Sequence, residues 1–169
     1  MTIIQNIICV ILVGFISCNS VNENNSVVIP QPDREIDKIK LTDLKNEPVD
    51  LNQYAGKAIF INIWATWCKP CLEEMPSIVN AQNLLRNENV VFLLASAETI
   101  EEIDTFRKLK TYPFNYVQIQ NSEELSIDSL PTTFIFNKKG KLVFSESGYR
   151  KWDDKNNIDT ILKIIHTNE

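Results

Sequence analysis

The sequence predicts an α/β domain in which a mixed sheet carries helices on both faces. A short apolar run at 58–64, rich in β-branched and aromatic residues, is typical of a central strand buried on both sides. A helical pattern follows it, and strand and helix patterns then alternate. Two late strand patterns are joined by Asn137–Gly140, a hairpin turn in which glycine can take a positive φ. The expected order is a β-hairpin, then βαβα, then a second hairpin and a last helix.

Each element has its own local signal. Weak alternation over Ile36–Leu41 predicts an edge strand, with Pro48–Leu51 as its partner in an added N-terminal β-hairpin. After Cys71, apolar residues at spacings of three and four predict a helix with Pro70 in its first turn and a kink at Pro76. The other expected elements are strands at 90–95, 116–119, 132–136 and 142–144, a helix with a capping box at about 99–109, and a last helix at about 158–165.

The composition excludes several classes of protein. With 169 residues, of which 44% are hydrophobic and 23% charged, the chain is long enough for one domain with a sizeable core. It is neither collagen-like nor of low complexity. A net charge of −5 and a pI near 5.0 argue against a nucleic-acid partner. A single histidine argues against histidine-rich metal sites and histidine-based triads.

The first 35 residues differ from the rest of the chain. No charged side chain precedes Glu23, and Ile7–Ile16 is apolar apart from one glycine. A helix of that length rises about 15 Å, half of the roughly 30 Å hydrocarbon thickness, which favours a secretory signal peptide over a spanning helix. We therefore expect a signal peptide at 1–17, a polar tether at 18–35 and the folded domain at 36–169.

Two of the four cysteines, Cys68 and Cys71, stand between the predicted central strand and its helix. A cysteine at the start of a helix faces unpaired N–H groups and the positive end of the helix dipole, which favour the thiolate. The pKa of the Cys68 thiol is therefore expected to lie below its free value, and Lys69 adds a nearby positive charge. The spacing allows a disulfide within one helical turn. Cys68 is then the attacking sulfur, and Cys71 resolves the mixed disulfide.

Two other uses of this cysteine spacing are possible. A closed zinc site needs four ligands, and only His166 remains as a further soft donor, so no metal is expected. An inert structural disulfide in an exported domain is the stronger alternative. The position between a buried strand and a helix favours redox chemistry over both.

The segment Trp64–Cys71, with the sequence WATWCKPC, resembles the active-site motif of the TlpA/ResA-like thiol–disulfide oxidoreductases. These are membrane-tethered proteins with a thioredoxin fold, and the resemblance extends from about residue 36 to residue 165. It implies a thioredoxin fold with an added N-terminal hairpin, and no cofactor beyond the redox-active disulfide. It also implies substrate contacts from Trp67, Lys69 and Pro70.

The segment Leu130–Phe134 resembles the cis-proline loop of the same family. The resemblance implies a cis Pro131 packed against the disulfide and a Leu130 backbone that pairs with the substrate chain. A trans proline that opens a strand is the alternative. The stretch Ser126–Ser129 departs from the family, whose approach to the cis-proline usually contains glycine.

Glu74 matches a carboxylate that ResA-like members carry close to their active-site cysteines. The resemblance implies that Glu74 accepts the proton of Cys71 during resolution. A solvated acid on the helix surface, like Glu73, is the alternative. Asn62 stands where thioredoxin has a buried aspartate, which favours the TlpA/ResA branch and leaves Asn62 without an acid–base role.

The segment Phe15–Cys18 resembles the lipobox of bacterial lipoproteins, although Phe15 stands where leucine is usual. The resemblance implies cleavage before Cys18 and lipid attachment to it, which would hold the domain on the periplasmic side of a bacterial membrane. An uncleaved N-terminal anchor and a plain cleaved signal are the alternatives. Cys9 is then an apolar residue of the signal, and no Cys9–Cys18 bridge is expected.

Together these features predict an exported, monomeric oxidoreductase that exchanges electrons between the Cys68–Cys71 pair and the thiols of partner proteins. The resemblance implies reduction of partner disulfides, with apocytochrome c and a membrane electron donor as partners. A peroxidase on the same fold is one alternative. A non-catalytic binding module with a structural disulfide is the other.

Overall fold

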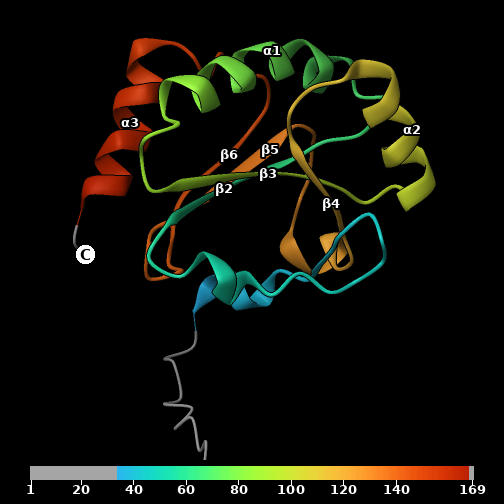
Figure 1. The fold of residues 1–169 in the computed structure, drawn as a ribbon, viewed down its shortest axis with the longest axis horizontal. Helices are drawn as coiled ribbons and strands as arrows, with labels where there is room; N and C mark the ends of the chain where they lie inside the picture. Colours follow the sequence, from blue (N-terminus) through green and yellow to red (C-terminus); the bar gives the residue numbers. More distant parts are fainter. Residues whose placement is uncertain (1–33, 168–169) are drawn as a thin grey trace, which may run out of the picture. The chain divides into compact units, whose positions relative to one another are not determined.

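A mixed six-stranded sheet organises residues 34–167, the part of the chain that the computed structural model describes (Figure 1). The strands are β1 Leu41–Thr42, β2 Ala58–Ile63, β3 Val90–Ser96, β4 Asn115–Ile119, β5 Thr132–Phe136 and β6 Leu142–Ser147. Their order across the sheet is β1-β4-β3-β2-β5-β6. β2 pairs parallel with β3 and antiparallel with β5, and all its residues are buried, as the sequence predicts.

The α-helices cover one face of this sheet (Figure 1). They are α1 Lys69–Leu84, α2 Ile100–Lys110 and α3 Lys155–His166. Each contributes buried apolar side chains to one core, which also contains Phe60 and Trp64 from β2 and the residue that follows it. The expected capping box of α2 is confirmed, because the Thr99 and Glu102 side chains each bond the other residue's backbone N–H.

The opposite face is covered by short 3-10 helices: η1 Glu35–Lys38, η2 Leu51–Tyr54 and η3 Ser122–Leu125. A second core lies there and contains Ile59, Ile61 and Ile63 from β2. Successive residues of a strand point to opposite faces, so β2 supplies both cores. The expectation of helices on both faces thus holds only through these short 3-10 helices, because the three predicted α-helices all pack on the first face.

The N-terminal hairpin is shorter than the sequence predicts. Glu35–Lys38 forms η1 in place of a strand, because the Ile36 N–H donates to the Gly140 carbonyl and the Ile36 side chain is buried. β1 pairs antiparallel with β4. The expected partner segment contributes a single bridge between Thr42 and Pro48.

The folded part includes two residues that the sequence analysis assigned to the tether. Arg34 bonds Asp37 and Asn52, and the Glu35 carboxylate accepts from the Leu142 N–H at 2.9 Å. The predicted signal peptide, the predicted lipidation site Cys18 and the rest of the predicted tether lie outside the described residues. Within residues 34–167, no helix has both the length and the apolar character needed to cross a membrane.

The turn between β5 and β6 requires glycine at position 140 for two reasons. The backbone there has a φ of 76°, and neighbouring atoms leave little room for a Cβ. A Cβ at this position would lie 2.8 Å from Cγ2 of Ile36 and 3.0 Å from Cβ of Arg34. We predict that Gly140→Ala lowers the free energy of unfolding by about 2–3 kcal/mol, as the sum of a left-handed backbone and crowding. Gly56→Ala is the control, because Gly56 has a φ of 80° but open space around its Cβ. Equal losses for the two variants in urea unfolding would contradict the role of the Ile36 contact.

Candidate active site

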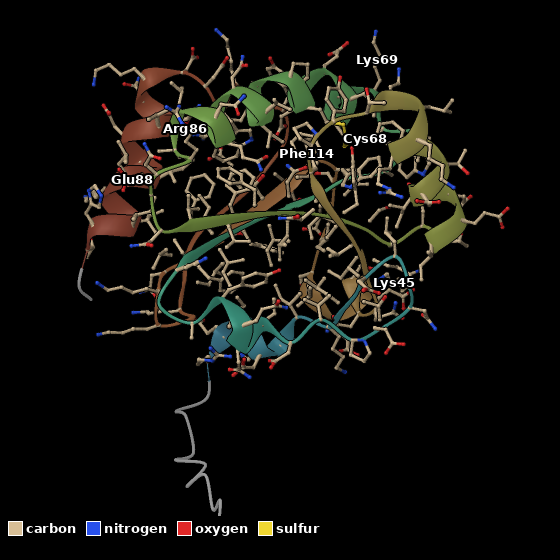
Figure 2. The ribbon with its side chains drawn as sticks, in the orientation of Figure 1. Lys45, Cys68, Lys69, Arg86, Glu88 and Phe114 are labelled. Atoms are coloured by element: carbon tan, nitrogen blue, oxygen red, sulfur yellow. A yellow bond between two sulfur atoms is a disulfide. The ribbon has the colours of Figure 1, made fainter. Side chains whose placement is uncertain are left out.

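The Cys68–Cys71 disulfide lies at the N-terminus of α1, with the two Cα atoms 5.3 Å apart (Figure 2). Cys68 is the N-cap residue, and its Sγ accepts a hydrogen bond from the Cys71 N–H at 3.3 Å. Pro70 lies in the first turn, where a missing N–H costs nothing. Both cysteines are buried, with 4% and 2% of their surface exposed. The Cys68 sulfur therefore replaces water as the partner of a helix N-terminal N–H.

The residues on either side of Cys68 are among the most exposed near the disulfide. Trp67 is 74% exposed, whereas Trp64 is buried against Phe106. The Lys69 side chain points outward (Figure 2), and its Nζ lies 3.7 Å from a Glu73 carboxylate oxygen. The positive charge of Lys69 is thus shared with Glu73 and does not act on Cys68 alone.

The proline loop faces the same end of the sheet. The Leu130–Pro131 peptide bond is cis, as the resemblance implies. Thr132, the first residue of β5, pairs with Ile63, the last residue of β2. Because the two strands are antiparallel, the segment that enters β5 and the segment that leaves β2 toward Cys68 meet at the same end of these strands. The Pro131 carbonyl accepts from the Gly148 N–H at 2.7 Å, which holds the loop from its other side.

Glu74 is buried, with 1% of its surface exposed, and three donors bond its carboxylate. The Asn62 amide donates at 3.0 Å, the Arg150 backbone N–H donates at 3.2 Å, and the Trp152 indole N–H donates to the same oxygen as Asn62. Asn62 also donates to the Thr133 hydroxyl on β5 at 3.0 Å. A network therefore joins α1, β2, β5 and the segment after β6.

Burial raises the pKa of the Glu74 carboxyl to about 7, although the hydrogen bonds from Trp152, Arg150 and Asn62 act in the opposite direction. Cys71 and Glu74 are three residues apart on α1, so they lie on one face of the helix, and both are buried. The solvated position considered for Glu74 belongs to its exposed neighbour Glu73. A carboxyl with this pKa can take up or release a proton at neutral pH.

Part of this network was not predicted. Asn62 was expected to have no acid–base role, and its amide does not titrate, but it donates a hydrogen bond to the Glu74 carboxylate. Trp152 packs edge-on against Phe60, and its indole N–H also bonds Glu74. Arg150 lies over the Phe144 and Trp152 rings and pairs with Glu146. No local sequence pattern predicts these contacts, because the residues that form them are far apart in the sequence.

A further unpredicted residue, Glu98, holds the loop that leads to Cys68. One carboxylate oxygen accepts from the Thr66 N–H at 2.7 Å, and the other accepts from the Thr66 hydroxyl at 2.5 Å. The Ser96 hydroxyl donates to Glu98 at 3.0 Å. The loop between β2 and α1 is thereby fixed to the loop after β3.

Neither a metal cluster nor a further cysteine accompanies the disulfide in the described part of the chain: residues 34–167 hold no group of three or more His, Cys, Asp or Glu side chains suited to a metal ion.

A family model described as Redoxin matches residues 31–162, most of the chain. The chain belongs to the Redoxin family. Among its relatives, the thiol-disulfide oxidoreductase ResA of Bacillus thuringiensis subsp. konkukian is 30% identical over 138 residues, which cover 78% of this chain and 77% of that protein. ResA of Bacillus subtilis is 29% identical over 108 residues, and the match covers 61% of this chain and 60% of that relative's length. The resemblance to TlpA/ResA-like proteins is thus confirmed.

Solved structures show the same fold. A thiol:disulfide interchange protein of the thioredoxin family from Chlorobium tepidum superposes with a TM-score of 0.60 at 23% identity, over 75% of this chain and 91% of that one. The thioredoxin domain of a thiol-disulfide oxidoreductase from Bacteroides vulgatus gives 0.63 at 21% identity, over 76% and 93%. The predicted thioredoxin fold of this Redoxin-family chain is confirmed.

The raised pKa of the buried Glu74 carboxyl predicts how the free energy of unfolding depends on pH. Folding raises the pKa of Glu74 from 4.5 to about 7, so the folded protein holds the proton more tightly. The contribution of Glu74 to the free energy of unfolding is therefore complete below about pH 4.5 and is lost as the pH rises through about 7. Relative to Glu74→Gln, the free energy of unfolding of the wild type should fall by up to about 3 kcal/mol across that window. Urea unfolding at a series of pH values measures the difference.

Glu73→Gln is the matched control, because Glu73 is the exposed neighbour on the same helix. The difference in free energy of unfolding between the wild type and Glu73→Gln should stay nearly constant over the same pH range. A constant difference for Glu74→Gln as well would contradict a raised pKa at Glu74.

Proposed function

We propose that the protein is a thiol–disulfide reductase that acts on disulfides of partner proteins outside the cytoplasm. The observation that carries the proposal is a disulfide at a helix N-terminus with a buried carboxyl of pKa about 7 one turn further along the same helix. The exposed Trp67 and the cis-proline loop lie at the same edge and supply the surface for a substrate chain. The oxidised form described above is the product of such a reduction.

The reaction consists of two exchanges in which atoms and electrons balance. In the reduced protein, the Cys68 thiolate attacks one sulfur of the partner disulfide, so that the partner S–S bond breaks and one partner thiolate leaves. The Cys71 thiol then loses its proton to the Glu74 carboxylate and attacks the Cys68 sulfur. This forms the Cys68–Cys71 disulfide and releases the second partner thiolate. Two electrons have moved to the partner, and an external dithiol must return the protein to its reduced form.

The buried carboxyl supports the resolution step of this reaction. Resolution by Cys71 needs a base in a place that water reaches poorly, since the pKa of a buried thiol is raised and its thiolate is scarce. Glu74 occupies such a place and shares a helix face with Cys71. Hydrogen bonds from Asn62, Trp152 and the Arg150 N–H hold this carboxylate in place.

The partners are proposed from the family resemblance. Apocytochrome c disulfides are a suitable substrate for a ResA-type protein, and a membrane-bound dithiol donor is a suitable reductant. One chain carries the cysteines, Glu74 and Pro131, so a monomer is sufficient for the chemistry. The leader at 1–17 and the lipobox-like Cys18 support export and attachment to the periplasmic side of a membrane.

Insulin reduction tests the activity. The wild type is expected to accelerate the reduction of insulin by dithiothreitol, whereas Cys68→Ser should abolish the acceleration because no nucleophile remains. Cys71→Ser should form a mixed disulfide that persists on Cys68, which mass spectrometry identifies. A wild type without activity and with a Cys68 that resists alkylation would contradict the proposal. Rapid oxidation of the reduced protein by peroxide, faster than by any disulfide, would favour a peroxidase.

Metabolic labelling tests the anchor. Cells that express the full chain with a palmitate analogue should yield labelled protein in the membrane fraction, and Cys18→Ala should yield none. Cys9→Ala is the control, since Cys9 lies within the apolar run that is expected to be removed. Label that persists in Cys18→Ala would contradict lipidation at this position.

A further inference from the structure

A groove of about 470 Å³ lies beside the disulfide. One wall consists of residues 63–65 and 67, which lead from β2 to Cys68, and another consists of residues 127–130, which lead to Pro131. The loop after β3 and the start of η3 complete it. Both active-site segments thus border the same groove, so a substrate chain joined to Cys68 and paired with the proline loop passes over it.

The lining of this groove is apolar, with charges of one sign. Apolar side chains include Ile63, Trp64, Ile127 and Leu130. The ionisable side chains that line it are all acidic: Glu98, Glu123 and Asp128. No lysine or arginine occurs between residues 111 and 137, so the segment that carries two of these acids has no basic side chain of its own.

The three carboxylates are not equivalent. Glu98 is bound by Thr66 and Ser96, which leaves it a fixed negative charge in the wall. Glu123 and Asp128 are exposed, and within residues 34–167 neither has a hydrogen-bond or ion-pair partner. The neighbouring Glu124, in contrast, is held by Asn121 and lies 3.7 Å from Nζ of Lys40. Two carboxylates on the groove are therefore available to a ligand from another molecule.

Trp67 provides a second feature suited to a cation. Its indole is 74% exposed and lines the same groove. An aromatic face attracts a nearby ammonium or guanidinium group, and the aliphatic stem of lysine or arginine packs on apolar surface while its charged end reaches water. Aromatic, apolar and anionic groups together complement a long cationic side chain better than a neutral or acidic one.

We propose that this groove recognises a lysine or arginine side chain in the partner segment that carries the target disulfide. The inference rests on the proposed reductase function and adds its substrate class: disulfides flanked by basic residues. The two thiol–disulfide exchange steps are unchanged, because no covalent bond to the basic side chain forms or breaks. Charge complementarity acts on the encounter, and so on the rate of the first exchange.

Three cyclic disulfide peptides test the inference. They share one length and differ only in the residues beside the cysteines, which are lysine, glutamine or glutamate. Stopped-flow fluorescence measures the second-order rate constant at which each peptide oxidises the reduced full-length protein in detergent. The lysine peptide should react about five- to tenfold faster than the glutamine peptide at low ionic strength, and the glutamate peptide slowest. High salt should reduce the spread.

Variants assign the preference to the groove. The double variant Glu123→Gln/Asp128→Asn should bring the ratio of the lysine and glutamine rates close to one, and Asp128→Lys should favour the glutamate peptide. Glu124→Gln is the matched control and should keep the wild-type ratio, because its carboxylate faces Asn121 and Lys40.

The outcomes separate this inference from the proposed function. Equal rates for the lysine and glutamine peptides in the wild type, or an unchanged ratio in the double variant, would overturn the charge preference and leave the reductase proposal standing. A reduced wild type that reacts with none of the three peptides would overturn both.

Discussion

The buried carboxyl group of Glu74 is the contact on which the arrangement of the site depends. Placing a carboxylate in an apolar core costs several kcal/mol unless donors surround it. Here three donors come from two separate parts of the chain: Asn62 on β2, and Arg150 and Trp152 in the segment after β6. Removing any one of these donors leaves the carboxyl less well satisfied, so the positions of α1, β2 and the segment after β6 are mutually constrained. The same burial gives the group a pKa suited to proton exchange at neutral pH.

This constraint extends to the substrate side of the disulfide. The Gly148 N–H holds the carbonyl of the cis Pro131, and two residues later the Arg150 N–H holds Glu74. Asn62 completes the link from the other direction, since its amide bonds both Glu74 and Thr133 on β5. Glu74 and the cis-proline loop are thus fixed to one framework. A network of this kind orients a functional group through its neighbours.

Patterns that are local in the sequence were predicted well. The buried strand β2, the helix that opens at Cys68–Pro70, the capping box at Thr99 and the β5–β6 hairpin each follow from a few consecutive residues. The cis Pro131 was expected from the family resemblance, because most X–Pro bonds are trans and the local sequence does not select the isomer. The N-terminal hairpin was overestimated. The contact between Ile36 and Gly140, more than a hundred residues away, turns that segment into η1.

The contacts that make the site specific come from pairs far apart in the sequence. Glu74 and Trp152, or Thr66 and Glu98, have no shared local pattern, and only the sheet order β4-β3-β2-β5 brings their elements together. The acidic groove arises in the same way, from loops after β3 and before β5. The spacing and position of the cysteines identified the redox pair from the sequence, and the family resemblance identified the proline loop. The charged and polar groups around these residues could be identified only from the folded structure.

The ionisation of Glu74 is the most direct test of this description of the site. Carbon-13 NMR of the oxidised protein, labelled at the glutamate carboxyl carbons, follows each carboxyl through a pH titration, and the Glu74→Gln variant assigns the resonance. Burial beside Trp152 and Asn62 predicts a midpoint near pH 7 for Glu74. A midpoint near 4.5, the ordinary value for glutamate, would contradict the buried carboxyl as the proton acceptor of Cys71.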